Sequence, residues 1–587
     1  MPLVLACLLS VTPERWVGFP PGQQRLASQG LWLAAALCAL GGMPWSGQGG
    51  DIIPGFRADP LGCLFFFAFA IIGFCAERGG RFHSRMPLAA TSACLAALST
   101  HPLALTGTGS AALVLAFSGR QSAAAGCLRT LLFAAACFPA SFWTAIVAAF
   151  VCCTGEGRRR ADFAQAPLLE AGCGLLVLCR TFLRPDCVVT PAMMATLLVG
   201  GVLLSLGRLA IVLTTSRASA AMVGQAMLPA SFAIISVGLI AYAQAADSAL
   251  TAHCAAAVLA LDIVIFWPVA AGFLCTGAWV AEGVGTDRLG RLGGLLLFAP
   301  RLAAFLAVAL FLLTCMPPGP GFSILWLLVE ATLGLLADGF ASALPALVFL
   351  FGEGAIIALT ALAALRFAAL LLLGNARSPR MAACSDVNWK SLWPVAATLG
   401  LAGLANCLPG GLLRLVEPVL ESLSGKKVEM ARQPWFTLAA PDGLSSWMPV
   451  GLVGMLAVVL GIVWLLKAKL LPGQSIVASP AREILPSVHV GETMPWLGGL
   501  TTRTQQLPFG DPLIWSGLDM APTAIRAMLL PTGSRAKIGC RRVAWFFRKM
   551  LKRLRHMITS SSEGADYGAA AVLALAACAL CMMAFWS

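Results

Sequence analysis

"CMPPGPGFSILWLLVEATLGL", residues 315–335, is an apolar stretch with a cluster of prolines and glycines near its start. Five consecutive residues, Pro317, Pro318, Gly319, Pro320 and Gly321, interrupt a run that is otherwise apolar enough to cross a membrane. Proline has no N–H to donate and glycine is a weak helix former, so the helix should break here. Backbone freed in this way is tolerated at membrane depth only where it is buried in protein or lines a cavity. Taken alone, the stretch favours an ordinary turn between two helices, with a broken membrane helix as the alternative.

The composition around this stretch is that of a membrane protein. Of the 587 residues, 59% are hydrophobic and only 11% are charged, whereas soluble domains carry about a quarter charged residues. Repeated apolar runs reach the roughly 20 residues that a spanning helix needs, and strand-like alternation is absent. The sequence predicts an all-α, polytopic helical bundle of about 14 transmembrane helices. The candidate spans are 61–77, 86–104, 124–153, 167–184, 191–214, 222–245, 249–281, 293–315, 322–337, 341–373, 391–413, 447–467 and 568–586, with less certain runs at 1–12, 29–43 and 109–118.

The chain divides into four parts by polarity. We expect a main bundle at 1–377, further spans with a polar connection at 378–470, a polar basic arm at 471–567 and a final span at 568–587. The formal charge of +14 does not indicate nucleic-acid binding, because the densest basic block, residues 535–556, lies beside a span. Basic residues in that position predict cytoplasmic placement, and they can contact anionic lipid or a partner surface. The "NARSPR" turn at 375–380 is expected on the same side, in an inner (cytoplasmic) membrane.

The cysteines do not form a metal or cluster motif. The 20 cysteines are scattered, most of them through apolar runs, and the single C-x-x-C, Cys578 and Cys581, has no second pair. Buried cysteine behaves as a small hydrophobe, so no metal site and no cofactor are expected in this chain. The N-terminal run lacks a basic region and a cleavage site, which favours a retained helix over a secretory signal.

An ordered set of short motifs resembles one family. "MPPGPGFSILWLL" resembles the "LPPxxGFxSEWLL" segment of hydrogenase 4 component B and the formate hydrogenlyase membrane subunit, which belong to the antiporter-like proton-channel subunits of respiratory complex I. Further matches follow the family's order along most of the chain. They are "FRADPLG" (56–62), "GVGTDRLGRLGGL" (283–295), "LRFAALLLLGNARSP" (365–379), "LPGGLLRLVEPVL" (408–420) and "PWLGGLTTRTQQLPFGDPL" (495–513). The resemblance implies a bundle in which two broken helices carry an ion path.

The resemblance also implies that the proton-carrying residues are largely lost. The family's central lysines, histidines and glutamates fall on residues that cannot carry protons, and no lysine occurs between residues 40 and 380. A segment bearing another broken helix, its lysine and its histidines is missing between Val151 and Ala166. The replaced positions are Ser118, Leu175 or Leu176, Ala220, Ala226, Trp267 and Leu325, while Asp262 stands for an asparagine and Arg366 for a lysine. Arginine keeps its charge at physiological pH, so it can fix a field but cannot pass on a proton.

The remaining intramembrane charges are the candidate polar sites. Glu330 follows the break, and Asp338 lies eight residues later on roughly the same helix face. Glu353 and Arg366 are expected to flank one helix. For Glu330, Glu353 and Arg366 two roles stay open, a polar role in the bundle interior and packing alone. Asp262 is a further candidate for an intramembrane polar site. Glu170, Arg180 and Arg208 lie near helix ends, where charged side chains commonly reach the interface.

By this resemblance the chain is a non-catalytic membrane-arm subunit of a complex-I-like or group-4 hydrogenase-type oxidoreductase. Its own role would be that of a scaffold or a weak ion path. Its partners would be other membrane subunits, the lipid bilayer and peripheral hydrogenase or dehydrogenase subunits, and not nucleic acid. Two alternatives stay open: a subunit of a cation/proton antiporter or ion-coupled uptake complex, and a stand-alone transporter.

Overall fold

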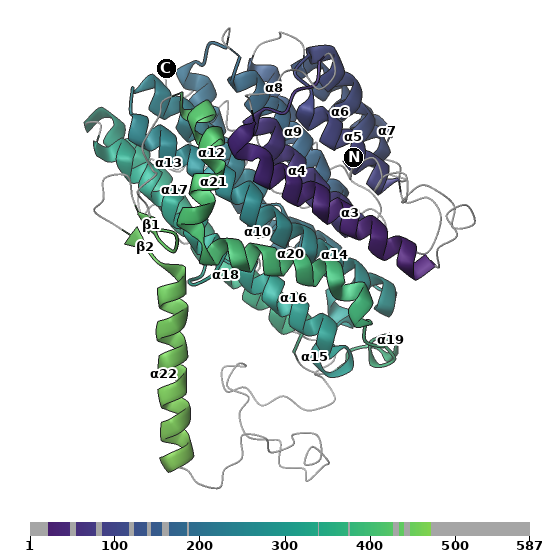
Figure 1. Cartoon of the computed structure of the whole chain (residues 1–587). Coiled ribbons are helices and arrows are strands. Elements are labelled where there is room, and N and C mark those ends of the chain that lie inside the picture. The colour runs from purple at the N-terminus through teal and green to yellow at the C-terminus, as the bar shows by residue number, and fades with distance from the viewer. Residues whose placement is uncertain are drawn as a thin grey trace, which may run out of the picture.

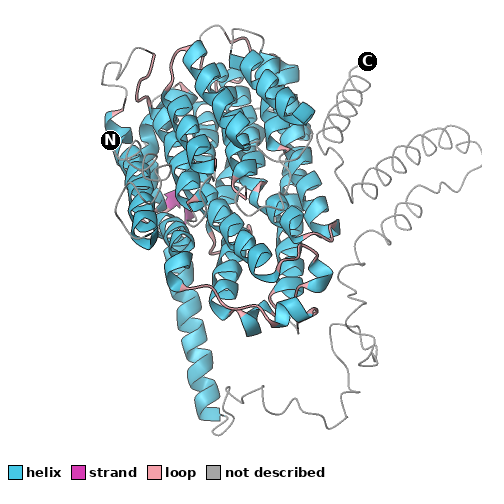
Figure 2. Ribbon diagram, turned by 90° about the vertical axis from the view of Figure 1, so that its right-hand side faces the viewer, coloured by secondary structure: helices cyan, strands magenta, loops and turns pink. Residues whose placement is uncertain are grey.

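The computed structural model is a bundle of helices (Figures 1 and 2). It describes residues 21–46, 55–77, 85–116, 123–137, 142–154, 164–184, 187–337, 340–373, 376–425, 434–439 and 446–470. The predicted runs at 1–12 and 568–586, the arm at 471–567 and Asp338 lie outside these residues. Within them the prediction of an all-α membrane bundle is confirmed.

The described chain up to Phe182 forms seven α-helices of 12 to 22 residues and one 3-10 turn. They are α3 (Pro21–Gly42), the 3-10 turn η1 (Met43–Trp45), α4 (Pro60–Ala76), α5 (Met86–Leu98), α6 (Pro102–Ala116), α7 (Ala123–Cys137), α8 (Phe142–Cys153) and α9 (Ala166–Phe182). The predicted run 124–153 is therefore two helices, α7 and α8, and the run 86–104 ends early because α6 begins at Pro102.

The second half holds the longer helices. They are α10 (Pro191–Thr214), α11 (Ala218–Ala226), α12 (Leu228–Ala245), α13 (Ala249–Leu261), the π-helical segment η3 (Asp262–Phe266), α14 (Trp267–Val284), η4 (Leu289–Arg291), α15 (Leu295–Phe298), α16 (Pro300–Leu313), α17 (Pro320–Ala337), α18 (Phe340–Leu371), α19 (Pro379–Ala382), α20 (Trp389–Cys407), α21 (Pro409–Ser424) and α22 (Pro449–Leu470). Before α22, strands β1 (Leu438–Ala439) and β2 (Ser446–Trp447) pair antiparallel, with Leu438 opposite Trp447.

Proline and short polar side chains set many of the helix starts. Asp59 caps α4 by accepting from the backbone N–H of Gly62, and Pro60 follows it in the first turn. Thr190 caps α10 in the same way, ahead of Pro191. Proline costs nothing in a first turn, because the N–H it lacks would have no partner there.

Length and hydropathy support a polytopic membrane protein. Among the described residues five helices are long and apolar enough to cross a membrane, or six if α20 and α21 count as one bent span. Eight shorter apolar helices of 10–17 residues accompany them, so the count agrees roughly with the 14 spans expected.

The centre of the bundle is the continuous helix made by α13, η3 and α14. The most apolar stretch of Thr251–Val284 is entirely buried by other helices. Helices α12, α17 and α21 pack on its first half, whereas α4, α11, α16 and α20 pack on its second half. Helix α22 stands away from the bundle, with exposed side chains along most of its described length (Figure 1).

Candidate functional site

The central helix is interrupted at Asp262. This carboxyl is fully buried, its Oδ2 accepts a hydrogen bond from Trp267 Nε1 at 3.1 Å, and its Oδ1 has no partner among the described residues. Pro268 cannot donate to the preceding turn and crowds the carbonyl four residues back, which explains why the helix widens here. Single-turn π segments inside α-helices are frequent at functional sites. The prediction of one plain span at 249–281 missed this segment.

The second interruption is the Pro-Gly stretch at residues 317–321. Helix α16 ends at Leu313 and α17 begins at Pro320. Because α16 packs on α14 and α17 packs on α13, the two helices follow the central helix in succession, and the gap lies beside its middle. Met316 is 46% exposed, whereas Gly319, Pro320 and Gly321 are buried. The stretch is therefore buried on its second half only.

A polar cluster braces this gap. Asn406, near the end of α20, accepts a hydrogen bond from Ser323 Oγ at 2.8 Å and donates Nδ2 to the carbonyl of Pro318 at 3.0 Å. Trp447 donates its Nε1 to Ser323 Oγ at 2.9 Å. Three segments that are far apart in sequence thus provide one another's hydrogen-bond partners at the point where the backbone leaves the helix. Asn406, Ser323 and Trp447 were not among the sequence candidates, although Asn406 is conspicuous as an amide inside an apolar run.

The third interruption follows immediately after Asn406. Helices α20 and α21 meet at an angle of 95° around Leu408, as Figure 1 shows. Pro409 disfavours the helical conformation of the residue before it, and Leu408 leaves the helix with φ −121° and ψ 49°. The predicted span at 391–413 therefore covers most of α20 and only the start of α21, which together count as one bent span.

The three interruptions meet at one level of the bundle. A Cβ on Gly321 would come 3.1 Å from the ring of Phe266 in the π segment and would also clash with the carbonyl of Thr314. Helix α20 packs directly on η3. Freed carbonyls, a buried carboxyl and the Asn406 cluster are thereby gathered around the middle of the central helix, which makes this region the candidate functional site.

Glu353 lies on a neighbouring helix and is fully buried. Its Oε1 accepts a hydrogen bond from Thr332 Oγ1 at 2.9 Å, which joins α18 to α17. Its Oε2 has no partner among the described residues. Glu330, on α17, is only partly buried. Among the predicted carboxylates that the structure describes, Glu353 and Asp262 therefore each combine full burial with an unpaired oxygen.

Two of the three buried arginines among the described residues, Arg208 and Arg366, bind backbone carbonyls. Arg366, on α18, donates to the carbonyls of Val212 at 2.8 Å and Thr215 at 3.5 Å, at the end of α10. Arg208, on α10, donates to the carbonyl of Cys153 at the end of α8. Both guanidinium groups thus lie against helix ends, where cations are stabilised by the unsatisfied carbonyls. Glu353 and Arg366 share α18, as expected, but each has its own partners.

The expectation that Glu170 and Arg208 reach the interface is wrong. Arg208 is 8% exposed, and Glu170 is 1% exposed and pairs with Arg129 at 2.9 Å. Burying either charge alone would be costly, so the bundle neutralises Glu170 internally. Arg180 instead makes two hydrogen bonds of 2.7 and 2.8 Å with Asp59 and remains partly accessible.

The positions where the family resemblance puts proton-carrying side chains are mostly apolar and buried. Leu175, Leu176, Ala226, Trp267 and Leu325 are all at most 2% exposed. In place of a lysine, Trp267 fills the core and donates one hydrogen bond to Asp262. Ser118 lies outside the described residues.

Two further buried polar side chains were missed by sequence reasoning. His253, on α13, and Gln225, on α11, are almost fully buried, and the side-chain polar atoms of both lack hydrogen-bond partners among the described residues. His253 lies about one turn inside α13.

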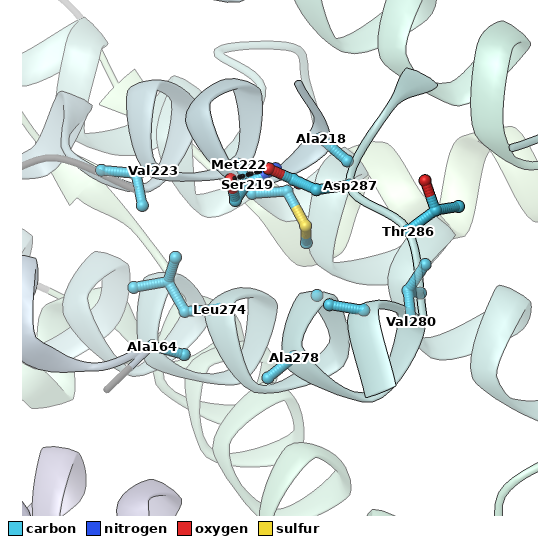
Figure 3. Close-up of a pocket in the computed structure, with 12 residues that line it drawn as sticks. Ala164, Ala218, Ser219, Met222, Val223, Leu274, Ala278, Val280, Thr286 and Asp287 are labelled. Carbon is cyan, nitrogen blue, oxygen red and sulfur yellow. Dashed lines mark hydrogen bonds between the residues drawn. The ribbon is translucent and has the colours of Figure 1, made fainter. Parts of the chain in front are cut away.

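A small pocket lies between α11 and α14 (Figure 3). None of the buried charged residues described above lines it. Its walls are mainly apolar, and its one carboxylate, Asp287, accepts hydrogen bonds from the backbone N–H and hydroxyl of Ser219 at 2.7 and 2.6 Å. Asp287 therefore closes the loop after α14 onto the start of α11.

Comparison with known proteins identifies the fold. No family model and no curated protein matches the chain. Among solved structures, a chain of the membrane-bound sulfane sulfur reductase, an archaeal respiratory membrane complex, is similar with a TM-score of 0.60 and 14% identity, covering 94% of this chain and 100% of that one. A chain of respiratory complex I from Thermus thermophilus gives 0.51 and 19%, covering 72% and 99%. A chain of the Mrp complex from Dietzia sp. DQ12-45-1b gives 0.52 and 16%, covering 96% and 63%. At these identities the similarity establishes a shared fold.

Proposed function

We propose that this chain is a membrane-arm subunit of a complex-I-like or group-4 hydrogenase-type oxidoreductase, antiporter-like in fold and with a degenerate proton path. The fold shared with chains of the sulfane sulfur reductase complex and of complex I supports this proposal. A second support is the set of short motifs that resemble hydrogenase 4 component B and follow that family's order over most of the chain.

The observation that carries the proposal is the pairing of Trp267 with Asp262. An ion path needs groups that both accept and release a proton at membrane depth, and a buried lysine beside a carboxylate meets that need. Here the carboxylate lies at a helix interruption, but its neighbour is an indole that cannot be protonated. The helix geometry of an ion path is thus present without its relay.

The remaining charges then have structural roles. Arg208 and Arg366 hold helix ends together, Glu170 is neutralised by Arg129, and Glu353 joins α17 to α18. Glu330 and Asp338 belong to the same proposal as packing or subunit-contact residues. A subunit held rigid by such contacts suits a scaffold, with at most a weak ion path.

The proposed partners are other membrane subunits, and through them peripheral hydrogenase or dehydrogenase subunits, in a cytoplasmic membrane. Helix α22 supports contact with other membrane subunits. Most of its apolar side chains from Val453 to Val463 are exposed beside the bundle. At Gly454 and Gly461 no other described atom lies within 4 Å of the position that a Cβ would occupy, so another helix could approach the backbone closely.

A subunit of a cation/proton antiporter or ion-coupled uptake complex is the second candidate. The similarity to the Mrp complex chain favours it, since 96% of this chain is covered. That chain is longer, because only 63% of its length is matched.

Native purification distinguishes the two candidates. The chain, tagged at its N-terminus and expressed at its natural level, is extracted in mild detergent, and co-purifying proteins are identified by mass spectrometry. A nickel-binding large subunit with iron–sulfur partners is the expected result. Recovery of antiporter-type membrane subunits without any redox protein would contradict the oxidoreductase assignment and support the second candidate.

A further inference from the structure

Basic side chains gather where α14, α16, α18 and α20 begin or end on one side of the bundle. Around these helix ends the described residues include seven basic and three acidic side chains, a net charge of plus four: Arg217, Arg288, Arg291, Arg301, Arg377, Arg380, Lys390, Glu282, Asp287 and Asp386. Two of the acids are already engaged, Asp287 by Ser219 and Asp386 by the backbone N–H groups of Arg301 and Leu302. The region therefore carries positive charge beyond what its own acids neutralise.

Four exposed members of this set, Arg291, Arg301, Arg380 and Lys390, form what we call the basic corner. Helix α15 ends three residues before Arg301, and it packs on α19, which contains Arg380. The hydroxyl of Ser378, two residues before Arg380, donates to the carbonyl of Arg291 at 2.9 Å. Arg301 lies over the ring of Trp389, 5.6 Å from its centroid, and Trp389 precedes Lys390. Local contacts thus hold these four charges in one neighbourhood.

Exposed aromatic residues accompany the basic corner. Trp389 is 59% exposed and Trp393, one turn along α20, is 44% exposed. Tryptophan is enriched where a membrane protein crosses the interface between headgroups and hydrocarbon. The basic corner therefore lies at headgroup level.

Apolar side chains continue from this corner along both helices. Helices α16 and α20 start together, since Asp386 and Trp389 contact Arg301, and both extend to the Pro318–Asn406 contact. Beyond the corner, the exposed side chains include Val308 and Phe311 on α16 and Leu404 on α20. An amphiphile with an anionic head and apolar chains matches this sequence of surfaces.

We propose that the basic corner binds the headgroup of an anionic phospholipid, whose acyl chains lie along α16 and α20. The phosphate and its ester oxygens accept from Arg301, Arg380 and Lys390, as charge-assisted hydrogen bonds require. The Arg301 guanidinium rests on Trp389 and its Nε lies 3.9 Å from Asp386 Oδ2, so the headgroup would be bound by its two terminal N–H₂ groups. Arg380 already donates one hydrogen bond, of 3.4 Å, to the carbonyl of Gly285 and has further N–H groups for the phosphate. An acidic protein surface would use the same charges, but the apolar continuation at membrane depth favours lipid.

The test is lipid binding to the full-length chain, purified and stripped of lipid in detergent. Phosphatidylglycerol, phosphatidylcholine and inorganic phosphate are titrated separately, and bound lipid is counted by native mass spectrometry. We expect phosphatidylglycerol alone to bind and to raise the melting temperature. Each juxtamembrane basic side chain strengthens binding to anionic lipid by about fivefold, so R301Q should weaken it about fivefold and R301Q/R380Q/K390Q on the order of a hundredfold.

Two matched variants guard against misfolding and general charge effects. R85Q removes an exposed arginine at the start of α5, a helix that packs on α4 and α6, and should bind phosphatidylglycerol as the unchanged chain does. R301K keeps the charge and should retain most of the binding even if R301Q is poorly folded.

Several outcomes would overturn the proposal. Equal stabilisation by inorganic phosphate would mean a site for a free anion, and equal binding of phosphatidylcholine would mean that the headgroup charge is not read. Unchanged phosphatidylglycerol binding by the triple variant, together with loss of co-purifying membrane proteins, would identify the corner as a protein interface instead.

Discussion

Asn406→Ala is the change that most directly tests whether the polar cluster holds the broken helices together. The amide is 7% exposed, and it connects the end of α20 to both Ser323 and the carbonyl of Pro318. Removing it leaves the Pro318 carbonyl without this donor and the Ser323 hydroxyl without this acceptor.

The size of the effect follows from these two contacts. Polar contacts between membrane helices contribute about 0.6 kcal/mol each on average and up to about 1.7 kcal/mol. A buried group left without a partner costs about 1–3 kcal/mol. The two lost bonds alone give about 1 kcal/mol, and the orphaned Pro318 carbonyl brings the expected loss of unfolding free energy to about 2 kcal/mol.

Unfolding in mixed micelles with increasing sodium dodecyl sulfate measures this loss, with tryptophan fluorescence as the signal. Ser422→Ala is the control, because the Ser422 hydroxyl bonds to the carbonyl of Val419 in its own helix. It should change the unfolding free energy by less than about 0.5 kcal/mol. A double-mutant cycle between Ser323→Ala and Asn406→Ala should return a coupling of about 0.6–1.7 kcal/mol.

The reasoning fails if Asn406→Ala unfolds at the same detergent fraction as Ser422→Ala. It also fails if Asn406→Leu, which keeps the side-chain bulk, is as stable as the unchanged chain. Either result would mean that the cluster is incidental and that apolar packing alone positions the interruptions. A coupling near zero, with a large single effect of Asn406→Ala, would limit the loss to the Pro318 contact.

Three other predictions address conduction, topology and the close approach at the break. In liposomes with an imposed pH gradient and a compensating potassium current, the chain alone should conduct few protons and Glu353→Gln should change nothing; rapid dissipation abolished by that variant would reveal a working path. A reporter fused after Arg380 should be cytoplasmic, because basic residues beside spans stay on that side; an extracytoplasmic signal would reverse the topology. Gly321→Ala should lower the melting temperature strongly, because its Cβ would clash with the carbonyl of Thr314. Gly400→Ala is the control: nothing lies within 4 Å of its Cβ position, so it should leave the melting temperature unchanged or raise it. Thermal melts of both variants measure the difference.

Several features of this fold could be predicted from local sequence alone. Apolar run length predicts membrane helices because lipid offers no partner for an unpaired backbone, and α10 begins and ends at the residues predicted for it. The gap between Leu313 and Pro320 follows from prolines and glycines, whose effect on a helix does not depend on distant neighbours. The absence of lysine between residues 40 and 380 is likewise a property of the chain itself.

The candidate site could be predicted only in part. Asp262 was recognised as a candidate, but its partner Trp267 was seen only as a lost lysine and not as a hydrogen-bond donor. Pro409 was a local signal for the bend at Leu408, and the predicted span at 391–413 did not use it. The π segment had a weaker signal in Pro268, since proline near the start of a helix segment is also compatible with an ordinary first turn.

Which polar groups meet depends on the tertiary arrangement of the helices. Glu170 pairs with Arg129, which is 41 residues away in sequence, and Arg180 pairs with Asp59, which is 121 residues away. Neither separation follows from a local sequence pattern. Helix formation is settled by hydrogen bonds four residues apart, whereas a partner for a buried charge depends on how each helix is rotated and tilted within the bundle. That orientation is fixed by packing of the whole apolar surface, so the sequence determined that these charges lie in membrane helices, and the assembled bundle determined which of them are neutralised and which carbonyls they bind.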